Sequence, residues 1–177
     1  MRRLFAGLFV GLVSALGAAA LPATAAASSP TIVGIAVGSP DFSTLVAAVS
    51  CTGLVPTLNG AARHTVFAPT NEAFAKLGLN ASNICTALPT STLRNILLYH
   101  VTRGTRLAKS VLPRQSGKTR EITTLLAGQS FEVDSAGVIT TSSGGTSRIV
   151  AANIAASNGV IHVIDTVLIP GSSSRDN

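Results

Sequence analysis

The first half of the chain shows apolar side chains at helical spacing, interrupted by glycine and proline. Ser39 can cap a helix, and Pro40 fits its first turn. Apolar residues then recur every three or four positions, at Phe42, Leu45, Val46 and Val49. The spacing predicts a helix that Gly53 ends. Residues 31–37 before it carry four further apolar side chains, and residues 54–58 after it lead to a loop at 59–60.

Two more helices are predicted before residue 101. Residues 65–68 read as a strand that Pro69 stops, and Thr70 or Asn71 caps the helix that follows. This helix is expected to bury Phe74 and Leu77 and to end at Gly78. A third helix is predicted from about residue 89 to residue 100, with a buried side defined by Leu93, Ile96, Leu97 and Tyr99.

Beyond Val101 the period of the apolar pattern changes from 3.6 residues to two. Five segments alternate in this way and are separated by turns rich in Gly, Ser and Asn. The predicted strands are residues 122–126, 130–134, 138–141, 149–155 and 159–169. Because helices come first and strands later, with no internal repeat, the pattern predicts a single α+β domain.

The first 27 residues are typical of a cleaved signal peptide. Arg2 and Arg3 precede an apolar run up to Leu21, and small residues follow, so we expect cleavage after Ala25 or Ala27. An uncleaved membrane anchor is the alternative, since the run is nearly long enough to span a bilayer. Residues 171–177 form a polar tail. The predicted domain is therefore residues 31–170 of a secreted, extracellular or periplasmic protein without a membrane span after cleavage.

Charge and cysteine content refine this prediction. The 177-residue chain carries 13 Lys and Arg against seven Asp and Glu, a formal charge of +6, which becomes +4 without Arg2 and Arg3. This mildly basic balance does not indicate a nucleic-acid partner.

In an oxidising compartment, Cys51 and Cys85 are expected to form a disulfide, whereas two free buried thiols remain the alternative.

No catalytic motif stands out. G-x-S-x-G, H-E-x-x-H and G-x-G-x-x-G are all absent from the sequence. His64, His100 and His162 could join Glu132, Asp134 or Asp165 in a site only through the tertiary fold. His162 and Asp165 lie three apart, so on a strand they point to opposite faces. We therefore expect no enzymatic activity, catalytic residue, cofactor or metal.

Two features are candidates for interaction. Tyr99 and His100 end the third predicted helix, where the histidine can bond the last helix carbonyls and the ring can pack in the core. A recognition role is the alternative. Six cations also fall within 18 residues before the first acid, Glu121: they are Arg103, Arg106, Lys109, Arg114, Lys118 and Arg120. They form either a solvated surface or a binding patch for a polyanion.

Four ordered segments resemble those of the fasciclin domain family. The entry segment is residues 31–45, residues 65–74 resemble the first signature block, residues 97–101 contain the central Tyr99–His100 motif, and residues 159–170 resemble the closing block. The resemblance implies a compact wedge, in which a β-sandwich has helices packed along one side and edge. It also implies adhesion or matrix interaction without a cofactor, and it assigns the recognition role to Tyr99 and His100.

These observations together predict a secreted, non-enzymatic adhesion module of bacterial type. The expected partner is an extracellular or envelope protein, or an acidic polysaccharide, and no nucleic acid. A self-associating structural protein of the envelope or matrix is the first alternative. A secreted hydrolase that uses His100 or His162 is the second.

Overall fold

Most helices of this protein come before Val101 and most strands after it, as its apolar pattern predicts. The structure is a computed structural model that describes residues 29–171. Its helical segments are α1 (Ile32–Val37), the 3₁₀ turn η1 (Pro40–Phe42), α2 (Ser43–Cys51), α3 (Val55–Asn59), α4 (Asn71–Ala75), α5 (Ile84–Ala87), α6 (Thr90–Tyr99) and α7 (Ala108–Val111). Its strands are β1 (His64–Pro69), β2 (Val101–Arg103), β3 (Thr119–Thr123), β4 (Ser130–Asp134), β5 (Val138–Thr141), β6 (Thr146–Ala156) and β7 (Gly159–Ile164). The predicted α+β class is confirmed.

The seven strands form a sheet in the order β2-β1-β7-β6-β5-β4-β3. Within residues 29–171 the one parallel pair is β1 and β7, with His64 opposite Gly159 and Pro69 opposite Ile164. A Cβ at Gly159 would overlap the His64 carbonyl oxygen, so only glycine permits this approach. The first and last strands of the order also meet, because Leu125 N donates to Val101 O at 2.7 Å just beyond β3. The sheet therefore folds over on itself, and its two halves face each other.

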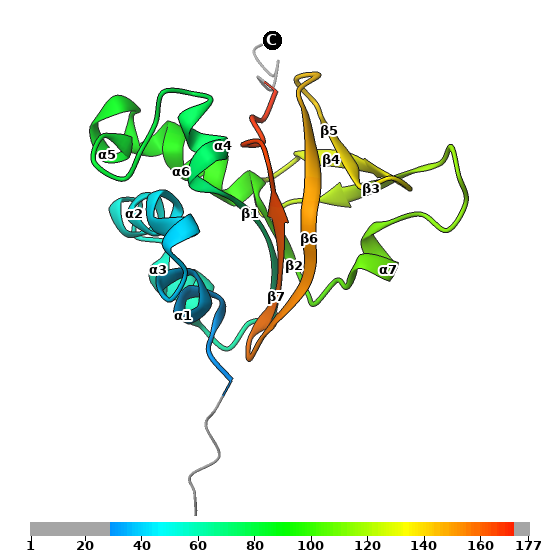
Figure 1. The fold of residues 1–177 in the computed structure, drawn as a ribbon, viewed down its shortest axis with the longest axis horizontal. Helices are drawn as coiled ribbons and strands as arrows, with labels where there is room; N and C mark the ends of the chain where they lie inside the picture. The colour runs from blue at the N-terminus through cyan, green and yellow to red at the C-terminus, as the bar shows by residue number, and fades with distance from the viewer. Residues whose placement is uncertain (1–28, 172–177) are drawn as a thin grey trace, which may run out of the picture.

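Strands β1 and β7 form the middle layer of the molecule. Every residue of both strands is buried, which is the mark of a strand that is covered on both faces. Their alternate side chains divide between two cores. Val66 and Ile161 belong to a core shared with the helices, whereas Phe67 and Ile164 belong to a core shared with β3, β4 and β5. Figure 1 shows α1, α2 and α3 on one side of this layer and β3–β6 on the other.

We call these the helix-side core and the sheet-side core. The sheet-side core contains the nine buried residues Phe67, Tyr99, Val111, Ile122, Phe131, Val133, Ile139, Ile164 and Leu168. In it the Phe67 and Phe131 rings meet edge to face with centroids 5.0 Å apart, and the Tyr99 and Phe131 rings do so at 5.8 Å. The helix-side core is larger and is lined mainly by Ile, Leu, Val and Ala, with Phe42 and Phe74 as its buried rings.

The predicted elements differ from the structure at several boundaries. The third predicted helix is α6, and β4 and β5 have the predicted limits. Residues 55–59 are helical rather than a lead into a loop. The prediction that Leu77 is buried is wrong: α4 already ends at Ala75, so Leu77 is 43% exposed and Leu79 is buried instead.

Two strand predictions also end in the wrong place. Strand β3 stops at Thr123 because the Thr124 hydroxyl donates to the carbonyls of Leu126 and Gln129 and turns the chain. Strand β7 stops at Ile164 because the next residue, Asp165, uses its carboxylate to accept from Arg148 N and from the Ser147 hydroxyl. Side-chain bonds to nearby backbone, which an apolar period does not reveal, end both strands.

Candidate functional site

The Tyr99–His100 pair lies inside the molecule. Tyr99 is 0% exposed, and its hydroxyl donates to Ser130 O at 2.7 Å. His100 is 2% exposed at the C-terminal end of α6. The two side chains thus join α6 to the sheet-side core, and neither presents a surface to a partner.

Both ring nitrogens of His100 are occupied by backbone bonds. Leu168 N donates to Nε2 at 2.9 Å, which fixes the proton on Nδ1, and Nδ1 in turn donates to Ile96 O at 2.7 Å. Burial lowers the pKa of His100 to about 4, and the hydrogen bond to Ile96 offsets this only in part. The imidazole is neutral at physiological pH and ties the helix end to the segment after β7.

His162, in the closing block of residues 159–170, is buried and hydrogen-bonded to backbone in the same way as His100. It is fully buried on β7, where Nδ1 accepts from Asn153 N at 3.3 Å and Nε2 donates to Arg106 O at 2.8 Å. Burial is again the main cause that lowers its pKa. Asn153 has a left-handed φ of 63° and accepts from Ala108 N through its side chain. His162 and Asn153 thus hold the segment between Arg106 and α7 against β6.

His64 and the acids do not assemble with these two histidines. His64 is on β1 opposite Arg103, and burial with the nearby Arg103 charge lowers its pKa. The Asp165 carboxylate is engaged by backbone and hydroxyl donors, and its pKa is lowered by those bonds against the effect of burial. Within residues 29–171 no group of three His, Cys, Asp or Glu side chains could hold a metal ion.

The six cations of the basic stretch occupy different elements. Arg103 ends β2, Arg106 is half-buried in the following loop, and Lys109 lies in α7. Arg114, Lys118 and Arg120 line one open surface hollow together with Glu121. The Arg120 guanidinium also donates to Ser110 O at 2.8 Å, which anchors the hollow to the end of α7. The structure therefore brings three of the six cations to one place.

The overall arrangement now has a counterpart among known proteins, because residues 40–170 match the model of the fasciclin domain. The chain belongs to the fasciclin domain family. It is 40% identical over 146 residues to protein sll1483 of Synechocystis sp., covering 81% of this chain and 75% of that protein. It is 39% identical over 140 residues to the transforming growth factor-beta-induced protein ig-h3 of Sus scrofa, covering 79% of this chain and 19% of that protein.

A solved structure supports the same assignment of the fold. The FAS1 domain pair from the insect cell adhesion molecule fasciclin I superposes with a TM-score of 0.66 at 21% identity, over 80% of this chain and 51% of that one. This likeness establishes the fold alone. The fasciclin domain family is known for cell-adhesion and extracellular proteins.

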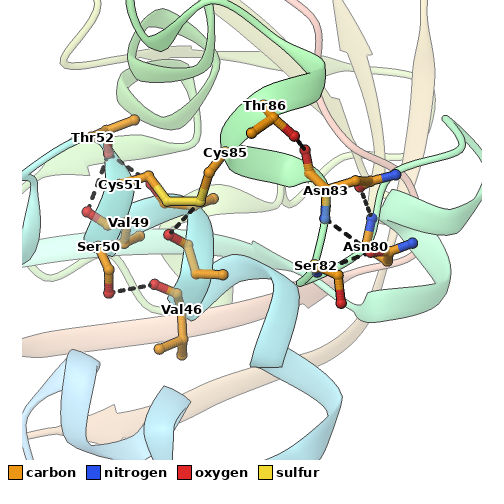
Figure 2. Close-up of a disulfide and its surroundings, with 12 residues drawn as sticks. Val46, Val49, Ser50, Cys51, Thr52, Asn80, Ser82, Asn83, Cys85 and Thr86 are labelled. Carbon is orange, nitrogen blue, oxygen red and sulfur yellow. Dashed lines mark hydrogen bonds between the residues drawn. A yellow bond between two sulfur atoms is a disulfide. The ribbon is translucent and has the colours of Figure 1, made fainter.

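In this fasciclin domain the two cysteines are joined. Cys51, the last residue of α2, is bonded to Cys85 in α5, with their Cα atoms 5.9 Å apart. Figure 2 shows the bridge beside a loop in which Asn80 and Asn83 bond each other's backbone. The bridge links α2 to α5 in the helix-side core and closes a loop of 34 positions.

Two asparagines have roles that the sequence analysis missed. Thr70 is the residue that caps α4, whereas Asn71 reaches back and accepts from Thr44 N at 3.0 Å. Asn158, which precedes Gly159 in the turn between β6 and β7, is buried: it accepts from Ile32 N at 2.9 Å and donates to Leu58 O at 2.7 Å. It thus holds α1 and α3 to the β6–β7 turn. Asn-Gly signals a hairpin but does not reveal such long-range bonds.

The signal peptide predicted at residues 1–27 lies outside the described residues, as does the tail after Gly171. No helix in the part of the chain that the structure describes is long and apolar enough to cross a membrane.

Proposed function

We propose that this fasciclin domain is an exported adhesion module that binds an acidic polysaccharide through the hollow formed by Arg114, Lys118 and Arg120. The observation that carries the proposal is the concentration of positive charge: three cations and a single acid, Glu121, line this hollow. Export follows from the predicted signal peptide, and the family of adhesion and extracellular proteins supports a binding role.

The position of the hollow favours a large, extended partner. The loop that carries Arg114 and Lys118 follows α7 and leads into β3, and Figure 1 shows it projecting on the side of the sheet away from α1–α3. Both side chains are exposed. A polyanion that approaches from this side can bind the hollow through several of its own negative groups at once, which a single small anion cannot.

A hydrolase is disfavoured by the histidines themselves. A general base needs a ring nitrogen that is free to take a proton. His100 and His162 each use both nitrogens in backbone bonds, and burial lowers the pKa of each. Neither can accept a proton without losing a bond that holds the fold.

Self-association remains the alternative for a structural protein. Within residues 29–171, β3 ends the strand order and pairs with β4, and β2 contacts its other edge only near Thr123, so the rest of that outer edge could accept another strand. However, Lys118 and Arg120 lie at this edge, and cations at an edge oppose pairing between like copies. Sedimentation over a range of protein concentrations separates a polysaccharide-binding module from a self-associating protein. A molecular mass that stays constant supports the module, and a molecular mass that rises with concentration supports self-association.

The decisive test uses two matched double charge reversals on a heparin column. Arg114→Glu with Lys118→Glu changes the hollow, and Arg63→Glu with Arg148→Glu makes the same change in net charge at exposed positions elsewhere. We expect the first variant to elute at much lower salt than wild type and the second to elute close to wild type. An equal drop in elution salt for both variants would contradict the proposal, because the column would then respond only to net charge. Thermal melting of both variants checks that each is folded.

A further inference from the structure

The helix-side core contains an apolar cavity of about 200 Å³ that is open to solvent on one side. Its walls come from α1, α2 and α3 on one side and from β1, β2 and the end of α6 on the other. Figure 1 shows these three helices clustered beside the β1–β7 layer. Val33 and Ala36 of α1, Val46 and Val49 of α2 and Val66 of β1 are among the lining residues. Nothing in the proposed polysaccharide site uses this cavity.

The cavity offers no free polar group from its lining side chains. Ser50 and His100 are the two polar residues in the lining. The Ser50 hydroxyl donates to Val46 O at 2.8 Å, and both ring nitrogens of His100 are bonded to backbone. A water molecule needs two to four polar partners to be held in a buried site. The lining therefore favours an apolar occupant over water.

The walls also restrict the shape of that occupant. Among the residues that the structure describes, the lining contains no Phe, Tyr or charged side chain, and it is made of Val, Ile, Leu and Ala apart from Ser50 and His100. Phe42 and Phe74, the buried rings of the helix-side core, are not among the lining residues. Aliphatic walls provide dispersion contacts to a chain of methylenes and no partner for a charged group.

The cavity opens at the end of α1. Val37, its last residue, is 64% exposed although it lines the cavity, and Ser50 is exposed on α2. Because these two lining residues are exposed, the cavity is open to solvent on this side, and an apolar molecule can enter here. Its polar end could then remain in water beside Val37 and Ser50.

We propose that this cavity binds one neutral aliphatic chain, with the hydrocarbon inside and a weakly polar end at the mouth. Apolar cavities of similar size in proteins, about 150 Å³, stay dry and take apolar ligands. The chain belongs to a free small molecule or to the tail of a neutral lipid, which share this chemistry.

The first experiment titrates ¹⁵N-labelled protein with 1-decanol and, separately, with 1,10-decanediol. Decanol should bind with saturation and shift the amide signals of Val33, Val46 and Val101. The diol must bury an unpaired hydroxyl, and a buried polar group without a partner lowers affinity by about tenfold or more. Equal affinity for the two alcohols, or shifts only at exposed positions such as Val150, would overturn the proposal.

A pair of alanine substitutions tests the location. Ala36→Phe places a ring in the cavity, and Ala75→Phe makes the same change at an exposed residue at the end of α4. We expect Ala36→Phe to abolish decanol binding while it keeps or raises the melting temperature, and Ala75→Phe to bind as wild type does. Binding that survives in a folded Ala36→Phe protein would overturn the proposal. Should Ala36→Phe fail to fold, the comparison of alcohol and diol on the wild-type protein decides.

Flotation with phosphatidylcholine vesicles distinguishes the two sources of the chain. If wild type floats with the vesicles and Ala36→Phe does not, the chain is a lipid tail. If neither floats but wild type binds decanol, the chain is a free molecule. If both float equally, vesicle binding does not use the cavity, and a lipid tail is ruled out as its occupant.

Discussion

The two faces of the β1–β7 layer are stabilised in different ways. On the sheet side, three aromatic rings meet edge to face and the side chains of five strands fill the space. On the helix side, six-residue and five-residue helices with small aliphatic side chains leave a cavity, and a disulfide joins α2 to α5. One middle layer thus combines close packing on one face with a disulfide and open space on the other.

His100 lies where the two faces meet. Its ring lines the cavity of the helix-side core, yet its Nε2 accepts from Leu168, whose side chain belongs to the sheet-side core. Tyr99, the residue before it, points to the sheet side. The central motif of this fasciclin domain is therefore a junction between the two cores, and changes to it should be felt on both faces.

The largest effect is expected from Phe131→Ala in the sheet-side core. Phe131 contacts the rings of both Phe67 and Tyr99 and is 2% exposed. Removing it should lower the free energy of unfolding by about 3–5 kcal/mol, because the ring's transfer free energy is lost and a cavity remains. Urea unfolding measures this. A cost below about 1 kcal/mol would show that the sheet-side core is not closely packed.

Loss of the disulfide should have the next largest effect on stability, and we expect it first in the two helices that the bridge joins. Closing a loop of 34 positions stabilises a protein by about 4 kcal/mol in the chain-entropy model. Reduction should therefore lower the urea midpoint and speed amide exchange in α2 and α5 before it does so in β4 and β5. An intact mass that does not rise by two hydrogens on reduction would mean that the thiols were already free.

Acid should lower the free energy of unfolding through protonation of His100, which joins the two cores. The unfolded chain binds a proton at His100 near pH 6.5, whereas the folded protein does so only near pH 4. Between these values the unfolded state holds more protons, so stability is fully present above about pH 6.5 and is lost as pH falls towards 4. The difference corresponds to about 3 kcal/mol. His64 and His162 act in the same direction, since burial lowers the pKa of each.

The measurement is urea unfolding of wild type and His100→Gln at several pH values from 7 to 4. Glutamine can donate and accept but does not titrate, so the variant should show a flatter pH profile even if it is less stable at pH 7. A profile as steep as that of wild type would assign the acid sensitivity to the other histidines. The carboxylate of Asp165 contributes only at lower pH, since its pKa is already below the usual range.

Much of this fold follows from the sequence where a local period is long enough. The ten-residue α6 shows a full apolar stripe, and β4 and β5 alternate between polar turns, so their limits could be predicted. Helices α1, α3, α5 and α7 have only four to six residues, which is too short to establish a helical period. The parallel pairing of β1 with β7 joins segments almost a hundred residues apart, and no local pattern encodes it.

The candidate site was less predictable than the fold for the same reason. Six cations close together in sequence could be identified at once, but their division among β2, α7, β3 and two loops depends on where the chain turns. The apolar cavity could not be predicted from the sequence, because it is the space that several short elements leave unfilled and no residue pattern marks it. Asn158 likewise looks like a turn residue until α1 and α3 are placed beside it.

The smallest expected difference in stability comes from making the same Val→Ala substitution once in each core. Val133→Ala removes two methyl groups from a fully buried side chain among rings, and Val49→Ala removes them from a side chain that lines the cavity. Methyl groups beside a void have contact partners on one side only, so less dispersion energy is lost with them. We expect Val133→Ala to cost about 1 kcal/mol more than Val49→Ala in urea unfolding. Equal costs would mean that the helix-side core is as closely packed as the sheet-side core, and the cavity would then be filled in solution by its own walls.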